Sequence, residues 1–63
     1  MPESFFNILF NDELITLEKK RVIAIEPYEQ GTKIFLEASH ASEEPLVYYS
    51  SEPYDSVMQA YLS

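Results

Sequence analysis

The sequence predicts an α+β fold, in which four or five antiparallel strands form a meander and one C-terminal helix packs on one face of the sheet. Two patterns lead to this prediction. Up to residue 50, short runs rich in aromatic and β-branched residues alternate with turn residues, as in consecutive antiparallel strands. After residue 53, apolar residues recur at helical spacing. A chain of 63 residues has the size of one small domain, so residues 1–63 are treated as a single unit.

Two strands joined by a tight turn are predicted first. Residues 4–10 read Ser-Phe-Phe-Asn-Ile-Leu-Phe, a composition that favours a strand. The pair Asn11-Asp12 is typical of a turn, and residues 13–17 are expected to pair back on the first strand as a hairpin. Residues 18–20 are polar and form a short corner before the next strand.

A second hairpin is predicted next. Residues 21–26 read as a strand, and Pro27 should end its ladder because proline has no N–H to donate. Gly31, the single glycine of the chain, is expected to supply the positive φ that a hairpin loop needs. Residues 32–38 form the returning strand.

A last strand and a helix complete the prediction. Residues 40–45 form a polar, exposed loop, and residues 46–49 form a strand. The helix should start in Ser50-Ser51-Glu52-Pro53, with a serine as N-cap and with proline and acids in the first turn. Its apolar stripe consists of Tyr54, Val57, Met58 and Tyr61.

Several predicted strands carry apolar side chains on both faces. By simple alternation, Val22 and Ala24 lie opposite Ile23 and Ile25, and Leu46 and Tyr48 lie opposite Val47 and Tyr49. A single helix covers only one face of a sheet. The other face therefore needs a second copy of the chain, as in a homodimer or other homo-oligomer, or a partner protein.

The order of elements resembles that of small bacterial and phage proteins of the FlbD-like type. The resemblance rests on residues 21–36, with an Ile-x-x-Ile-x-Pro-like strand and a Gly-Thr hairpin, and on the helix start at residues 51–57. In this chain the turn before the last strand is expanded to residues 39–45. The resemblance implies the same fold and a regulatory role through protein contacts without catalysis.

The sequence offers little that could carry catalysis or hold a cofactor. It has one histidine, His40, no cysteine and no Gly-rich phosphate loop. Ser50 and Ser51 are better explained as helix caps than as nucleophiles. The pair Glu43-Glu44 lacks the spacing of a calcium-binding loop. We therefore expect no enzyme, no cofactor and no metal site.

Charge narrows the range of partners. The chain has a net charge of −7, and three of its four cations lie together at Lys19, Lys20 and Arg21. After Lys33 there are five acids and no cation. Nucleic acid and acidic membranes need a basic surface, so neither is an expected partner. The sequence also lacks the features of a secretory signal and of a bilayer span, and the absence of cysteine fits a reducing compartment, so a cytoplasmic location is expected.

The acidic C-terminal half also holds several tyrosines, and this combination is the predicted partner-binding site. Its carboxylates could imitate the charge spacing of a nucleic acid while the aromatic rings fill an apolar pocket on a basic host protein. In general character such a protein resembles phage-encoded inhibitors of host DNA enzymes such as uracil-DNA glycosylase. The alternative is a solvated acidic face over a core in which the tyrosines simply pack. The predicted residues are Glu43, Glu44, Tyr48, Tyr49, Glu52, Tyr54 and Asp55.

Overall fold

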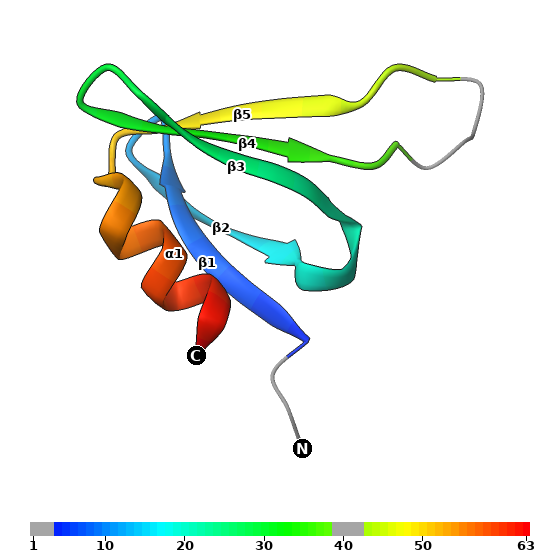
Figure 1. The fold of residues 1–63 in the computed structure, drawn as a ribbon, viewed down its shortest axis with the longest axis horizontal. Coiled ribbons are helices and arrows are strands. Elements are labelled where there is room, and N and C mark those ends of the chain that lie inside the picture. The colour runs from blue at the N-terminus through cyan, green and yellow to red at the C-terminus, as the bar shows by residue number, and fades with distance from the viewer. Residues whose placement is uncertain (1–3, 39–42) are drawn as a thin grey trace.

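The computed structural model describes residues 4–38 and 43–63, and it confirms the α+β prediction. Five antiparallel strands follow one another along the chain and one helix ends it (Figure 1). The elements are β1 (Phe5–Phe10), β2 (Glu13–Glu18), a short 3₁₀ turn (Lys19–Arg21), β3 (Val22–Tyr28), β4 (Gly31–Leu36), β5 (Leu46–Ser50) and α1 (Tyr54–Leu62). The predicted loop at residues 40–45 falls partly outside the described residues, and Glu43, Glu44 and Pro45 within it are exposed.

The strands form two sheets. β1 pairs with β2 as a two-stranded ribbon, and β3, β4 and β5 form a three-stranded sheet in that order. The ribbon crosses beneath the larger sheet, so it covers the face of that sheet which the sequence assigned to the helix alone (Figure 1). Both sheets and α1 contribute to one core, which consists of Phe6, Ile8, Leu17, Ile34, Leu36 and Val57.

The turn between β1 and β2 forms as the sequence predicts. Asn11 and Asp12 have φ angles of 51° and 64°, and Phe10 pairs directly with Glu13. Two consecutive residues at positive φ are the pattern of a type I′ turn, whose twist matches that of the flanking strands. Asparagine and aspartate tolerate this conformation better than other side chains because they bond to their own backbone.

The role predicted for Gly31 is wrong. In the turn between β3 and β4 the residue at positive φ is Glu29, at 53°, and Gly31 already belongs to β4. A positive φ at the first central residue alone matches a type II′ turn. Gly31 serves another purpose: a Cβ atom there would lie 2.2 Å from the backbone oxygen of Ser50. Glycine is required because the chain that follows β5 passes so close.

Pro27 does not end the ladder, contrary to the prediction. It lies inside β3 and pairs with Thr32, and the strand continues to Tyr28. β3 is an edge strand of its sheet. An edge strand tolerates proline, since a residue whose N–H would face away from the sheet loses no ladder hydrogen bond.

A β-bulge changes which side chains of β3 face the core. The register shifts between Val22 and Ala24, so Ile23 is the extra residue. Val22 and Ile25 consequently both pack against the core, whereas Ile23 is 57% exposed. Simple alternation, which placed Ile23 and Ile25 together, is therefore wrong for this strand.

Helix α1 packs by the predicted stripe but begins without a serine cap. The N-cap residue is Pro53, which has no side chain that could accept a hydrogen bond. The Ser50 hydroxyl instead accepts a hydrogen bond of 3.1 Å from the Glu52 N–H and turns the chain out of β5. Val57 is 1% exposed, and the ring of Tyr61 meets that of Phe6 edge to face at 5.4 Å.

Candidate functional site

The tyrosines of the predicted site point in different directions. Tyr48 lies on the inner side of β5, where its ring meets Phe10 edge to face with centroids 5.1 Å apart. Tyr49 is the next residue, so it lies on the outer side, and it is 50% exposed. Tyr54 belongs to the first turn of α1 and is half-buried beside β3. The structure does not bring these three rings together.

The acids of the predicted site are also separated. Glu43 and Glu44 are exposed before the start of β5, whereas Glu52 and Asp55 follow its end. The Glu52 carboxylate accepts a hydrogen bond of 2.9 Å from the Leu9 N–H, and the Glu52 carbonyl accepts one of 2.8 Å from Thr32. Glu52 thus joins β1, β4 and the end of β5, a structural role that its charge alone did not predict.

The sequence also singled out one histidine and a pair of acids as candidates for catalysis or metal binding. His40 lies outside the described residues. Within residues 4–38 and 43–63, no three His, Asp or Glu side chains are placed to hold a metal ion. Over the same residues, no helix is long and apolar enough to cross a membrane.

An aromatic surface lies on the three-stranded sheet, on the side away from the core. Strand register places seven side chains there, and we call this surface the outer sheet face. Its members are Ala24, Glu26, Tyr28, Lys33, Phe35, Val47 and Tyr49.

The outer sheet face is ordered by contacts among its own side chains. The rings of Tyr28 and Tyr49 lie 5.2 Å apart across the sheet. The Lys33 Nζ atom lies 5.0 Å from the centroid of the Tyr28 ring and 5.5 Å from that of Phe35. A lysine ammonium over two aromatic faces is held by cation–π attraction. Tyr28, Val47 and Tyr49 remain 41%, 37% and 50% exposed, so the surface is preformed and still open to a partner.

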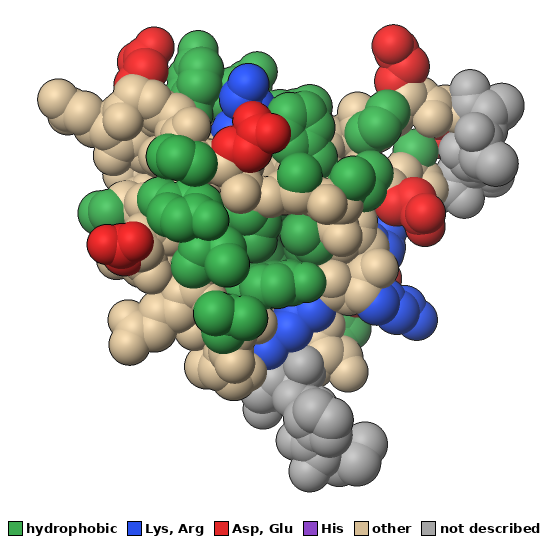
Figure 2. All heavy atoms as spheres, in the orientation of Figure 1, with side chains coloured by type: hydrophobic (Ala, Val, Ile, Leu, Met, Phe, Trp, Pro, Cys, Tyr) green, Lys and Arg blue, Asp and Glu red, His purple; other side chains and the backbone are tan. Residues whose placement is uncertain are grey.

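A second apolar surface lies where α1 meets β3. Figure 2 shows hydrophobic side chains gathered over this side of the molecule, while acidic side chains stand apart from one another around them. The bulge turns Ile23 toward this surface, which contains a shallow hollow of about 170 Å³. Its lining residues are Val22, Ile23, Ala24, Ile25, Tyr54, Met58 and Tyr61.

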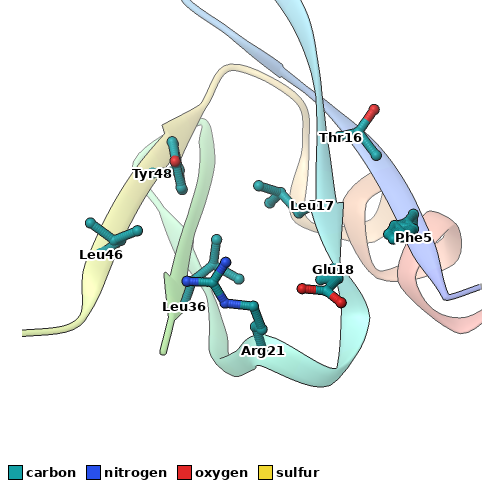
Figure 3. Close-up of a pocket in the computed structure, with 8 residues that line it drawn as sticks. All are labelled: Phe5, Thr16, Leu17, Glu18, Arg21, Leu36, Leu46 and Tyr48. Carbon is teal, nitrogen blue, oxygen red and sulfur yellow. The ribbon is translucent and has the colours of Figure 1, made fainter. Parts of the chain in front are cut away.

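A hollow of larger volume, about 460 Å³, lies between β2 and β5, and we call it the β2–β5 hollow (Figure 3). Leu17 points into it from β2, while Leu46 and Tyr48 face it from β5. The Arg21 side chain rises from the 3₁₀ turn, and its guanidinium points toward the end of β4. The full lining is Phe5, Thr16, Leu17, Glu18, Arg21, Leu36, Leu46 and Tyr48.

Comparison of the chain with protein-family models, with curated proteins and with solved structures found no match. The resemblance to FlbD-like proteins therefore stays a prediction. Function has to be argued from the surfaces just described.

Sequence reasoning selected Tyr49 of the outer sheet face and Tyr48 of the β2–β5 hollow, and it missed the other residues of both. A signal for the outer sheet face was present, since Lys33 and Phe35 alternate with the core residues of β4 just as Val47 and Tyr49 alternate with those of β5. No comparable signal marked the hollow, because its walls come from β1, β2, β4 and β5 and meet only in the folded chain.

Proposed function

We propose that this protein is a non-enzymatic protein-binding module that contacts its partner through the outer sheet face. One observation carries the proposal: three aromatic rings and a valine lie on one side of the sheet, where Tyr28 meets Tyr49 and Lys33 lies over Tyr28 and Phe35, and three of these four side chains are exposed. Aromatic side chains held in place before binding lose little conformational freedom when a partner arrives. They are the residues that most often dominate interface energy.

The charges around the outer sheet face indicate the character of the partner. Glu26 and Glu29 are exposed near the turn between β3 and β4, and Glu43 and Glu44 are exposed before β5. The aromatic centre therefore lies between acidic ends. This arrangement suits a cytoplasmic host protein with an apolar patch surrounded by basic residues, and occupation of a basic nucleic-acid-binding surface is one form of such an encounter.

The same face supports a second candidate, a homodimer. Glu26 and Lys33 are direct cross-strand partners on the outer sheet face. A two-fold axis through the face can place Lys33 of one copy against Glu26 of the other, because an isologous interface must be self-complementary. These opposite charges offset each other within the face, so two copies can approach there in spite of their net charge of −7.

Substitution of the exposed tyrosine tests the proposal. A host protein captured by the wild-type chain is identified, and its affinity is then measured against Tyr49→Ser. Loss of a central interface tyrosine is expected to weaken binding about 30-fold, the equivalent of about 2 kcal/mol. Leu14→Ser is the matched control, since Leu14 is 68% exposed on β2 and distant in register from the outer sheet face. Equal affinity of both variants would contradict the proposal.

Charge exchange separates the two candidates. In a homodimer Lys33→Glu should weaken self-association and the double variant Lys33→Glu with Glu26→Lys should restore it, because the two-fold contact is rebuilt with reversed signs. The affinity of a foreign basic partner should not recover in the double variant, because the charges on that partner are unchanged. Sedimentation over a dilution series measures the first effect and calorimetry with the captured protein measures the second.

A further inference from the structure

The β2–β5 hollow is bordered by two strands that each lack a neighbour. Among the described residues β2 pairs with β1 alone and β5 pairs with β4 alone. None of the backbone hydrogen bonds outside the strand pairs involves a residue of β2 or of β5 as the structure describes them. An edge strand presents a row of N–H and C=O groups, which is a template for another extended chain.

Apolar side chains form part of the lining of the hollow, beside Thr16, Glu18 and Arg21. Leu17 and Leu36 are 5% and 4% exposed, while Leu46 is 45% exposed at the edge of β5. Tyr48 closes the hollow toward Phe10. A volume of about 460 Å³ lies in the range of roughly 300–1,000 Å³ that is usual for ligand sites. An apolar side chain entering from the β5 edge would therefore find contacts on three sides.

One of the four cations of this acidic molecule, Arg21, lines the hollow. Arg21 Nη2 donates a hydrogen bond of 2.6 Å to the Glu37 carbonyl, which fixes the guanidinium and leaves further N–H donors for a ligand. Lys19 and Lys20 precede it in the chain. Glu18 also lines the hollow, and its carboxylate lies 3.7 Å from Lys20 Nζ. A carboxylate is thus attracted to Arg21, on a molecule whose net charge of −7 repels it from most other surfaces.

We propose that the β2–β5 hollow binds an extended, carboxylate-bearing segment of a partner protein, which pairs with the free edge of β5. The segment places an apolar side chain in the hollow and a carboxylate on Arg21. Residues i and i+2 of a strand point to the same side about 7 Å apart, so the recognised pattern is an apolar residue, any residue and then an acid. No side chain that lines the hollow belongs to the outer sheet face, although Val47 and Tyr49 lie on the strand that the segment pairs with, so variants of the lining residues test this proposal separately.

The probe is an acetylated and amidated peptide, Thr-Leu-Thr-Glu-Thr-Val, titrated into the isotope-labelled protein while amide chemical shifts are followed. Shifts are expected at β5, at Leu17 and at Arg21. The peptide with glutamine in place of glutamate should bind three- to tenfold more weakly, the range for a partly exposed charge-assisted hydrogen bond. A peptide N-methylated at alternate residues should lose binding, because it cannot complete the strand pairing.

Two protein variants complete the test. Arg21→Lys keeps the charge but removes the planar fork, and it should reduce the preference for glutamate over glutamine. Leu46→Asn changes a half-exposed wall residue and should weaken all peptides alike. Unchanged spectra at millimolar peptide, equal affinity for the glutamate and glutamine peptides, or full binding of the N-methylated peptide would each overturn the proposal. So would displacement of the peptide by an equal concentration of decanoate, which would identify the hollow as a site for any amphipathic carboxylate.

Discussion

Gly31→Ala is the sharpest test of how the sheet is built. The added Cβ would lie 2.2 Å from the Ser50 backbone oxygen and 3.3 Å from the Ser50 carbonyl carbon, so the chain after β5 must move away by about 1 Å. Overpacking of this kind lowers the free energy of unfolding by about 1–3 kcal/mol, whereas alanine restricts the unfolded chain and so raises it by about 0.4–1 kcal/mol. A net loss of about 1–2 kcal/mol should lower the melting temperature by about 5–15 °C in a domain of this size.

Glu29→Gly is the matched substitution at the same turn, and its expected effect has the opposite sign. Glu29 has a φ of 53°, a conformation that costs a residue with a side chain about 1–2 kcal/mol and glycine much less. The variant should melt at the wild-type temperature or above. Thermal unfolding followed by circular dichroism measures both variants. If Gly31→Ala melts with the wild type, or if Glu29→Gly is the more damaging change, the close approach of Ser50 to β4 is not as described.

Substitutions at three further positions test other parts of the structure. Glu52→Ala should lower the free energy of unfolding in urea by about 1–2 kcal/mol and speed amide exchange at Leu9. Glu52→Gln keeps an acceptor for the Leu9 N–H, so it should cost less than half as much. Equal losses would show that the charge and not the hydrogen bond matters. Val57→Ala should cost about 1–3 kcal/mol, because Val57 is 1% exposed in the core, and a loss near zero would place α1 elsewhere. Lys33→Gln should cost about 0.5–1 kcal/mol and release the Tyr28 ring, seen as a change in its proton shifts.

Local sequence signals predicted the elements well where local chemistry decides the structure. Asn11-Asp12 forms a two-residue turn because these side chains tolerate a positive φ, and no distant contact is needed. Ile34 and Leu36 of β4 face the core of the molecule by strict alternation, as predicted. The stripe on α1 follows in the same way from helical spacing, since Val57 and Tyr61 come to one side of the helix.

The predictions that failed depend on contacts between distant residues. The need for glycine at position 31 comes from Ser50, which lies across the sheet. The bulge at Ile23 cannot be distinguished from regular alternation in a run of apolar residues. Pro27 continues its strand because β3 has no neighbour on one side, a property of the sheet and not of the sequence around it. Each of these features requires knowledge of which strands lie side by side.

The candidate sites were also predicted where local sequence decides and missed where distant residues meet. Tyr49 was selected from the sequence and does lie exposed, but its neighbours Tyr28 and Lys33 come from other strands. Glu52 was selected for its charge, yet in the fold its carboxylate satisfies the Leu9 N–H of β1. Arg21 was taken as part of a basic corner, and only the folded chain shows that it lines a hollow. Composition thus indicated which residues were available, whereas their arrangement depended on strand order.

A ligand that adds a strand along the unpaired edges of β2 and β5 should stabilise the fold. Glu52 satisfies an edge N–H of β1, and α1 packs against β1 and β3, but no described element pairs with the facing edges of β2 and β5. A domain of 63 residues buries only about 60% of the surface its unfolded chain exposes, so an added strand is a large increment. At a ligand concentration about ten times Kd, binding adds about 1.4 kcal/mol to the free energy of unfolding, or about 5–10 °C in melting temperature.

Because strand pairing adds hydrogen bonds, the amides of β5 should exchange more slowly in the complex. A ligand of the outer sheet face should also raise the melting temperature, but it leaves the free edge of β5 as exposed as before, so exchange at Leu46–Ser50 distinguishes the two modes of binding.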